Sequence, residues 1–500
     1  FLLWAIPIQQ LVLNPEIAKT VAFANPSLTE KEVLDSMEKN LVVALLQAFS
    51  MNLIFGITLG LTSSFLSIKI GKRFRCPNCR ISFSRLDSIK RHLQKIHYEH
   101  VPQKKVVILG GGFGGVEALK KLQKSFENDI RVDITIINKD NFLLFTPMLH
   151  EVISGMVETS HVAVPLRSFC KRARFIEADV ERIDTEKREI RLRHGIFGGR
   201  RKETSDIGKR KVKDHYRHFQ IEYDYLLISL GGETNYYNSE KIKENSFSMK
   251  TLYDANSLRS HIISTLEQAD TLDNDNPVEL KRKRNLLTYL VVGGGFSGVE
   301  TVGEINEFIR ECIKQYYHNI DIGDLKVILV SAGNKILPEM EEHLGRFALE
   351  ELRKADVQII LSNRVTDIMN SDASINNSIS SSAKDKSPLG SILSHYNDHD
   401  HDKTSLMAVL NSDIRISTYT IIWTAGVIPE GLQGIPHTNK DKKGKLITNE
   451  YLQLNGLNNV FAVGDCASIT DPMTGNPCPP TAQHAIRQGE IAGRNLVSMI

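Results

Sequence analysis

Short apolar runs alternate with helical patterns along most of the chain after residue 103. The run VVIL at 106–109 precedes a stretch with helical periodicity, and the same order recurs from Asn285 onward, beginning with TYLVV at 288–292. Buried strands that alternate with helices predict βαβ units and parallel sheets. Because the whole pattern occurs twice, we predict an α/β fold with two Rossmann-like domains.

A different pattern occupies residues 41–68, which contain no charged side chain. A helix of this length would span about 42 Å, more than the roughly 30 Å hydrocarbon core of a bilayer, so we predict a transmembrane helix, with a buried core helix as the alternative. Lys69, Lys72, Arg73 and Arg75 follow it, whereas acidic and basic residues are mixed before it. The positive-inside rule then predicts a cell-membrane location, with everything downstream on the cytoplasmic side.

Overall charge changes this picture little. The 62 basic and 59 acidic side chains leave a formal charge of +3, which gives no argument for nucleic acid or for acidic substrates. The basic stretch at 200–219 is interpreted as a solvated hairpin extension. The polar segment between Met369 and Asp413 is expected to be a disordered insertion, so a metal site at its histidines is not favoured.

Glycines with the dinucleotide-binding spacing follow the first strand of each repeat. Gly110, Gly112 and Gly115 come directly after VVIL, and the second set, after TYLVV, consists of Gly293, Gly295 and Gly298. The first glycine permits the tight turn, the second lets a diphosphate approach the backbone, and the third lets helix and strand pack closely. Two such motifs predict two dinucleotides, a flavin and a nicotinamide, because hydride transfer requires one against the other.

The position that usually holds an acidic residue, at the end of the next strand, departs from the rule in both repeats. Asn138 stands there in the first and Ser331 in the second. An asparagine can still bond a ribose hydroxyl, so the first site is retained. A serine would not repel a 2′-phosphate, so NADPH stays open, although the lack of an arginine partner favours NADH.

With these residues in view, the chain from about Lys104 to Ile500 resembles the type II NADH dehydrogenases, which are single-subunit, non-pumping NADH:quinone oxidoreductases. The resemblance rests on the joint order of GGGFGG, FLLFTPMLHEV, YDYLLISLGGETN, GGGFSGVETVGE, ILPE, WTAGV, VFAVGDCA and PTAQHAIRQ. It implies FAD as cofactor, NADH as substrate and a membrane quinone as acceptor, with hydride passing from nicotinamide to flavin.

The resemblance also assigns residues around the flavin. Asp465 would bind the ribityl chain and Gly464 would allow close backbone approach, although Gly-Asp is also common in surface turns. Thr146 and Pro147 would lie beside the flavin ring. Arg167 would lie near the same cofactor, with a plain surface salt bridge as an equal alternative.

On the substrate side, the resemblance places Glu300 near the nicotinamide, where a carboxylate could orient the ring or relay protons. The alternative is an acid favoured by the helix dipole. Ala482 would lie between flavin and substrate, and Gln483 and Gln488 would face the quinone, because amides can hydrogen-bond a quinone carbonyl without titrating. As helix-face glutamines they would have no such role.

A separate motif precedes the enzyme-like part. Cys76, Cys79, His92 and His97 have the spacing of a two-cysteine, two-histidine zinc finger, which predicts bound Zn²⁺ in a small ββα module. The alternative is a basic juxtamembrane helix with incidental Cys and His. We expect a structural or protein-contact role rather than nucleic-acid binding, since one finger covers about three base pairs.

Two rival functions remain at this stage. A sulfide:quinone oxidoreductase shares the fold but needs a redox cysteine pair, which Cys170, Cys312, Cys466 and Cys478 do not form by motif. The other rival is a membrane-tethered zinc-finger redox sensor or nucleic-acid-binding protein. Homodimerisation stays open.

The expected organisation follows from these motifs. The chain begins at Phe1 and stops within a helix-like run, so we interpret it as cut at both ends, without the C-terminal membrane-docking segment usual in the family. The expected parts are an apolar segment and extracytoplasmic loop (1–40), the transmembrane helix (41–68), the zinc finger (74–100), the FAD-binding domain in two pieces (104–250 and 440–500), and the NAD(P)H-binding domain (285–430) with its disordered insertion (370–413).

Overall fold

The computed structural model describes residues 103–195, 216–370, 405–429, 432–473 and 475–500, together with 74–75, 82–83, 88 and 92. The part from Val101 to Ile500 forms one compact unit. The expected membrane helix at 41–68 lies outside the described residues. Within the described ranges, no helix combines the length and apolar character that a membrane crossing requires.

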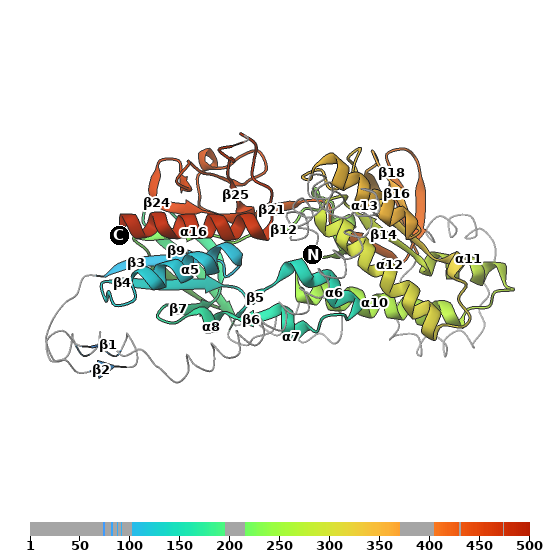
Figure 1. The fold of residues 1–500 in the computed structure, drawn as a ribbon, viewed down its shortest axis with the longest axis horizontal. Helices are drawn as coiled ribbons and strands as arrows, with labels where there is room; N and C mark the ends of the chain where they lie inside the picture. Colours follow the sequence, from blue (N-terminus) through green and yellow to red (C-terminus); the bar gives the residue numbers. More distant parts are fainter. Residues whose placement is uncertain are drawn as a thin grey trace, which may run out of the picture. The chain divides into compact units, whose positions relative to one another are not determined.

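The first parallel sheet has the strand order β23-β24-β11-β3-β4-β7, with β23 antiparallel at its edge. Its strands are β3 (Lys104–Leu109), β4 (Val132–Asn138), β7 (Arg174–Glu177), β11 (Tyr225–Ile228), β23 (Gln453–Leu454) and β24 (Leu457–Ala462). Helices α5 (Phe113–Ser125) and α16 (Ala482–Met499) lie side by side over one face (Figure 1), although they come from opposite ends of this unit.

The alternation of side chains along β3 explains why this sheet is covered on both faces. Val106 and Ile108 belong to the core beneath α5 and α16, whereas Val107 and Leu109 belong to the core on the other face. An antiparallel sheet of β8 (Asp179–Asp184), β9 (Glu189–Gly195) and β10 (Tyr216–Glu222) covers that second face. A strand buried on both sides has a continuous apolar run, as VVIL predicts.

The second parallel sheet has the order β13-β20-β14-β15-β16. Its strands are β13 (Phe247–Ser248), β14 (Thr288–Val292), β15 (Lys326–Val330), β16 (Val357–Ile360) and β20 (Thr420–Trp423). Its main helices are α10 (Leu252–Thr271), α11 (Pro277–Leu286), α12 (Phe296–Tyr316) and α13 (Glu342–Lys354). An antiparallel sheet of β17 (Val365–Asn370), β18 (Leu406–Leu410) and β19 (Arg415–Thr418) packs on the other side through its apolar residues. The prediction of two α/β dinucleotide-binding folds is therefore confirmed.

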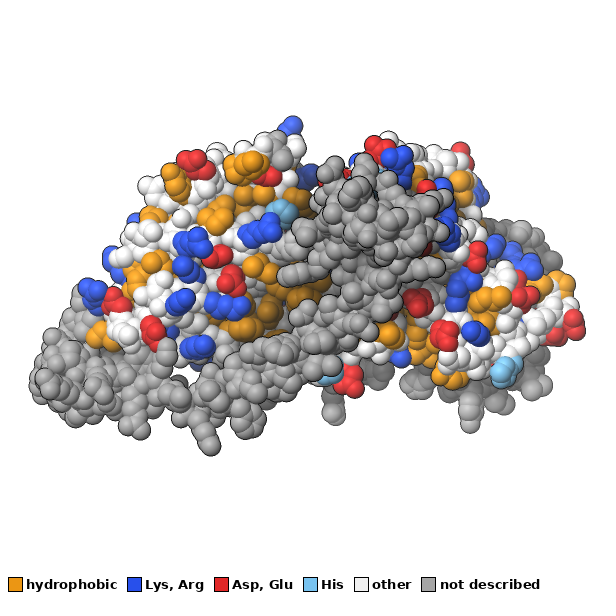
Figure 2. Space-filling view, in the orientation of Figure 1, with side chains coloured by type: hydrophobic (Ala, Val, Ile, Leu, Met, Phe, Trp, Pro, Cys, Tyr) orange, Lys and Arg blue, Asp and Glu red, His pale blue; other side chains and the backbone are white. Residues whose placement is uncertain are grey.

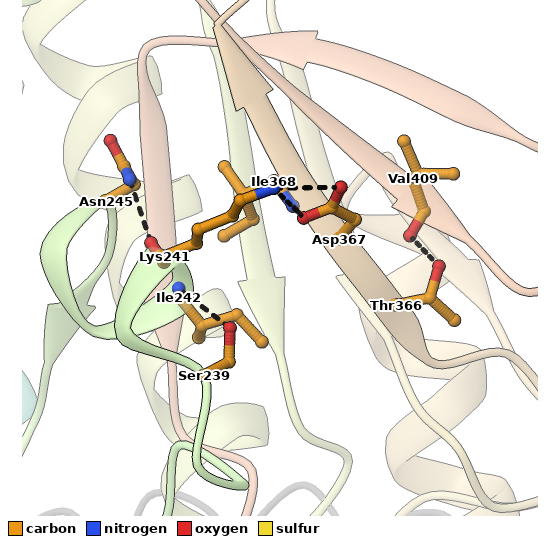
Figure 3. A network of polar contacts seen from close by, with 8 residues as sticks. All are labelled: Ser239, Lys241, Ile242, Asn245, Thr366, Asp367, Ile368 and Val409. Atoms are coloured by element: carbon orange, nitrogen blue, oxygen red, sulfur yellow. Dashed lines mark hydrogen bonds and ion pairs between the residues drawn. The ribbon is translucent and has the colours of Figure 1, made fainter.

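Helix α9 (Glu240–Glu244) contacts this antiparallel sheet through an ion pair, and further polar contacts lie within the helix and within the sheet (Figure 3). Ser239 caps the helix, and Lys241 Nζ lies 3.2 Å from Asp367 Oδ1 on β17. The Thr366 hydroxyl donates to the carbonyl of Val409 on the neighbouring strand at 3.1 Å. Because the Lys241 and Asp367 side chains are 64% and 39% exposed, this ion pair contributes less than about 1 kcal/mol and mainly sets orientation.

Residue 250, the expected end of the first part of the FAD-binding domain, lies beyond the point at which the chain leaves the first sheet. Strand β13 at Phe247–Ser248 pairs with β20 in the second sheet, and the chain has already crossed at β12 (Gly232–Thr234). It returns at β21 (Val427–Pro429), which pairs antiparallel with β12. The two crossings lie together because the strands of the second sheet, within residues 247–423, are inserted between the two chain segments that build the first sheet.

The expected insertion at 370–413 overlaps the described residues at both ends. Strand β18 occupies Leu406–Leu410 and pairs with both β17 and β19, since its apolar residues cover the second sheet. Residues 371–404 lie outside the described part. The basic stretch at 200–219 overlaps β10, which pairs with β9 up to Tyr216 opposite Gly195.

Basic and acidic side chains are interspersed over the described part of the face in Figure 2. No single sign dominates the described surface in this view. This distribution agrees with the near balance of charge in the sequence.

Candidate cofactor and catalytic site

The first glycine turn leaves space for a ligand at the start of α5. Gly110 has φ of +99°, a conformation that side chains rarely adopt. A Cβ at Gly115 would lie 2.0 Å from the Gly110 carbonyl oxygen, so helix and turn need a glycine there. A Cβ at Gly112 would meet nothing within 4 Å, which leaves the N-terminal amides of α5 accessible to an anion.

The second glycine turn repeats this geometry at the start of α12. Gly293 has φ of +126°, and a Cβ at Gly298 would lie 1.8 Å from its carbonyl oxygen. A Cβ at Gly295, the residue before the helix, would meet nothing within 4 Å. The two sites therefore share the tight turn, the close packing and the open approach that a diphosphate requires.

The residues that replace the usual acids lie at the ends of the expected strands, and Asn138 supports its glycine turn. Asn138 ends β4; its Oδ1 accepts from the Gly111 amide at 2.8 Å and its Nδ2 donates to the Asp140 carbonyl at 2.8 Å. Ser331 directly follows β15, is buried, and accepts from the Gly333 amide at 3.3 Å. Neither position presents a carboxylate.

Asp465 lies in a short 3-10 turn, η4 (Gly464–Cys466), where Gly464 has φ of +75°. The backbone amide of Gly464 donates to Oε1 of Gln488 on α16 at 2.8 Å. The turn and the helix line one pocket together with other polar and apolar groups: Lys445, Ala467, Ile469, Cys478, Pro479, Pro480, Thr481, His484 and Ala485. Gln488 is buried and therefore positions this turn.

Lys250 is a site residue that no sequence motif marks. We call each parallel sheet, with the elements packed on it, a lobe. Lys250 precedes α10 in the second lobe. Its Nζ atom lies 4.0 Å from Asp465 Oδ2 in the first lobe. The two side chains are 34% and 25% exposed. Burial lowers the pKa of Lys250, while the Asp465 carboxylate acts in the opposite direction. The ion pair places an ammonium group beside Asp465 in η4.

The FTPML motif forms a loop next to the first glycine turn. Thr146 and Pro147 are exposed in the 3-10 turn η1 (Thr146–Met148). The neighbouring Phe145 ring packs edge-on against Phe113, the first residue of α5, with centroids 5.6 Å apart. This contact holds the loop at the start of α5, the helix that follows the first glycine turn.

Helix α6 (Leu149–Ser154) continues from this loop and packs against α10 and α12 of the second lobe. Its His150 Nδ1 lies 3.7 Å from Glu300 Oε2 on α12. Burial raises the pKa of Glu300 to about 7, with Glu151 adding to the rise, and burial lowers the pKa of His150 to about 4. Near neutral pH, Glu300 can therefore gain or lose a proton while His150 stays neutral.

The remaining predicted residues are placed less centrally. Arg167, in α8 (Leu166–Phe169), is exposed and stacks on the Phe175 ring, 5.0 Å from its centroid. Ala482 and Gln483 open α16 after Thr481, whose hydroxyl accepts from the His484 amide. Gln483 is not among the residues that line the pocket with Gln488.

Three of the predicted zinc ligands, Cys76, Cys79 and His97, lie outside the described residues, and the fourth, His92, is helical. In the described ranges, no group of three His, Cys, Asp or Glu side chains has the arrangement of a metal site. Strand β1 (Phe74–Arg75) pairs antiparallel with β2 (Ser82–Phe83).

Comparisons with known proteins agree with this geometry. A family model described as pyridine nucleotide-disulphide oxidoreductase matches residues 104–489. A Dictyostelium discoideum protein described as "Probable NADH dehydrogenase" is 26% identical over 387 residues, covering 77% of this chain and 71% of that protein. A Staphylococcus aureus type II NADH:quinone oxidoreductase is 25% identical over 402 residues, covering 79% and 82%. The fold is similar to that of NDH2 from Plasmodium falciparum in complex with NADH, with a TM-score of 0.59, 20% identity and coverage of 78% and 82%.

Proposed function

Since the chain belongs to the pyridine nucleotide-disulphide oxidoreductase family, we propose that it is a flavoprotein that transfers hydride from NADH to FAD and two electrons onward to a membrane quinone, without pumping protons. The two relatives described as NADH dehydrogenase and type II NADH:quinone oxidoreductase support this choice within the family.

The observation that carries the proposal is the pair of open glycine turns. Gly112 and Gly295 each leave free space at a helix N-terminus, where a side chain would otherwise stand. Both turns therefore fit a dinucleotide diphosphate. In the described residues, the four cysteines are free thiols, so a disulfide-reductase role has no support from a cysteine pair.

The bound flavin would supply the redox chemistry, because its ring accepts a hydride and gives up two electrons. The chain holds and orients it. Gly112 would admit the diphosphate, Asp465 would accept hydrogen bonds from ribityl hydroxyls, and Gln488 fixes the turn that carries Asp465. Thr146 and Pro147, on the exposed loop beside α5, would border the ring.

Glu300 supplies a proton-exchanging group on the nicotinamide side. Its carboxyl group is bordered by α6, and burial raises its pKa to about 7. Such a group can hold a proton at Oε2 and release it near neutral pH without a large free-energy cost. Gln483 would contribute an amide at the quinone end, whereas Gln488 acts through Gly464.

The test uses the full chain extracted from membranes. Its absorption spectrum should show a bound flavin, anaerobic NADH should bleach that flavin, and added quinone should restore the colour. A colourless protein that takes up no flavin would contradict the proposal. Bleaching by sulfide but not by NADH would instead identify the sulfide:quinone oxidoreductase alternative.

We also propose that residues 74–100 bind one zinc ion as a two-cysteine, two-histidine finger. The antiparallel pairing of β1 with β2 and the helical conformation of His92 support this, because a ββα module requires both. Metal analysis of the full chain should find one zinc per chain, and Cys76→Ser with Cys79→Ser should remove it. Equal zinc in both proteins would contradict the site.

Residues 41–68 are proposed as the membrane tether, with the catalytic part on the cytoplasmic side of the cell membrane. The support is the uncharged run and the basic residues that follow it. Alkaline carbonate should leave the full chain in the membrane pellet. Replacing Leu53 and Phe55 by Asp should release it, whereas release of the unaltered chain would contradict the tether.

A further inference from the structure

We propose that the second glycine turn accepts NADPH with an efficiency within about tenfold of that for NADH. The proposal rests on the proposed function and deepens it by naming the coenzyme class. It is carried by residues 331–335, which directly follow β15 at the edge where the adenosine ribose would lie and which include Lys335 and no carboxylate.

The position of this loop follows from its hydrogen bonds to the glycine turn. The Gly293 amide donates to the Val330 carbonyl at 2.8 Å, and the Leu337 amide donates to the Gly294 carbonyl at 2.7 Å. Strand β15 also lies directly beside β14, which carries the turn. In this fold the residue that ends the second strand contacts the ribose 2′ position. Ser331 is that residue.

The Ser331 side chain does not present a group that would select a free 2′-hydroxyl. It is only 6% exposed, and its hydroxyl accepts from the Gly333 amide. A Cβ at Gly294 would lie 2.5 Å from the Ser331 oxygen, so the hydroxyl is turned toward the glycine turn. The carboxylate that would bond a 2′-hydroxyl and repel a 2′-phosphate is therefore missing.

Two exposed basic residues, Lys335 and Arg364, lie in or next to this loop. Residues 331–335 read SAGNK, and Lys335 is exposed. The loop after β16 joins it, because the Ser362 amide donates to the Gly333 carbonyl at 2.8 Å and the Asn363 amide to the Ser331 carbonyl at 3.0 Å. Exposed Arg364 follows directly. A dianionic 2′-phosphate would be attracted to such an edge.

The experiment compares kcat/KM for NADH and NADPH with the full flavin-loaded chain and one soluble quinone. The unaltered protein should give values within about tenfold of each other. Replacing Lys335 by Gln should lower the NADPH-to-NADH ratio about tenfold, the size expected for one charge-assisted hydrogen bond. Lys335→Glu should lower it further, because it adds a repelling carboxylate.

Lys326→Gln is the matched control, since Lys326 is an exposed lysine at the opposite end of the same strand. It should leave the ratio unchanged. Ser331→Asp should restore NADH selectivity, but Ser331 is buried, so the exposed Lys335 variants provide a test that does not depend on repacking.

The outcomes separate this proposal from the proposed function. If neither coenzyme reduces the flavin, the proposed function fails. If NADH works and NADPH is more than about tenfold poorer, the function stands and the coenzyme proposal is overturned. A ratio that does not respond to Lys335→Glu would likewise overturn it.

Discussion

The His150 Nδ1 atom lies 3.7 Å from Glu300 Oε2, which joins the helix after the FTPML loop to the helix after the second glycine turn. Lys250 and Asp465 make a second contact between the lobes, at 4.0 Å. Both contacts involve residues that the proposed chemistry uses. The positions of the two glycine turns relative to each other therefore depend in part on these charged groups.

We predict that Glu300→Gln keeps the flavin bound but lowers turnover at least tenfold, because the amide cannot exchange a proton. Burial raises the pKa of Glu300 to about 7, so turnover of the unaltered enzyme should titrate near pH 7. A pH profile of kcat measures this. The variant should lose that titration step, and an unchanged profile would remove Glu300 from the site.

The raised pKa of Glu300 should also make folding less favourable as the pH rises. A carboxyl whose folded-state pKa is raised favours folding only while protonated, so its contribution decreases as pH rises from about 4.5 through 7. Glu300→Gln should therefore unfold no earlier than the unaltered protein at pH 8. A lower unfolding temperature for the variant at that pH would show a structural role for the carboxylate.

His150→Gln should reduce the loss of stability in mild acid. Burial lowers the pKa of His150 to about 4, so the unfolded chain takes up the proton first. Its contribution is complete above about pH 6.5 and disappears as pH falls toward 4, with an upper bound of about 3 kcal/mol. Urea unfolding at pH 7.5 and pH 5 measures the difference. The control variant His343→Gln should behave like the unaltered protein, because the His343 side chain is 63% exposed whereas that of His150 is only 17% exposed.

Lys250→Met should weaken FAD binding about tenfold or more, because it removes the ammonium beside Asp465. Fluorescence titration of the apoprotein with FAD measures this, and Lys250→Arg should restore most of the affinity. If Lys250 only joined the lobes, Lys250→Met would instead lower the unfolding temperature of the apoprotein and leave the affinity for FAD unchanged.

Gly112→Val and Gly115→Ala should fail in different ways. A Cβ at Gly112 meets no protein atom within 4 Å, so the variant should fold but bind FAD weakly, since the side chain fills the ligand's space. A Cβ at Gly115 lies 2.0 Å from the Gly110 carbonyl oxygen, so Gly115→Ala should destabilise the apoprotein itself by several kcal/mol, the range of severe backbone clashes. Thermal unfolding and FAD titration of both apoproteins distinguish the two effects. Equal stability of the two variants would contradict this account of the turn.

The two glycine turns and the strands before them were predictable because each depends on residues close together in sequence. The apolar run VVIL identifies a strand that is buried on both faces, and Gly110, Gly112 and Gly115 follow from the local geometry of a strand, a turn and a helix. The boundary expected at residue 250 lies beyond β13, which already belongs to the second sheet. The pairing of β12 with β21 joins segments far apart along the chain, and no local pattern signals it.

By itself, the sequence determined the α/β class, both glycine turns and the missing acids at Asn138 and Ser331, because backbone conformation and strand burial there depend on neighbouring residues. Only the tertiary structure decided that Lys250 faces Asp465, that Gln488 supports Gly464, and that His150 meets Glu300. Those contacts join distant segments, and their charges and burial exist only after the lobes have formed.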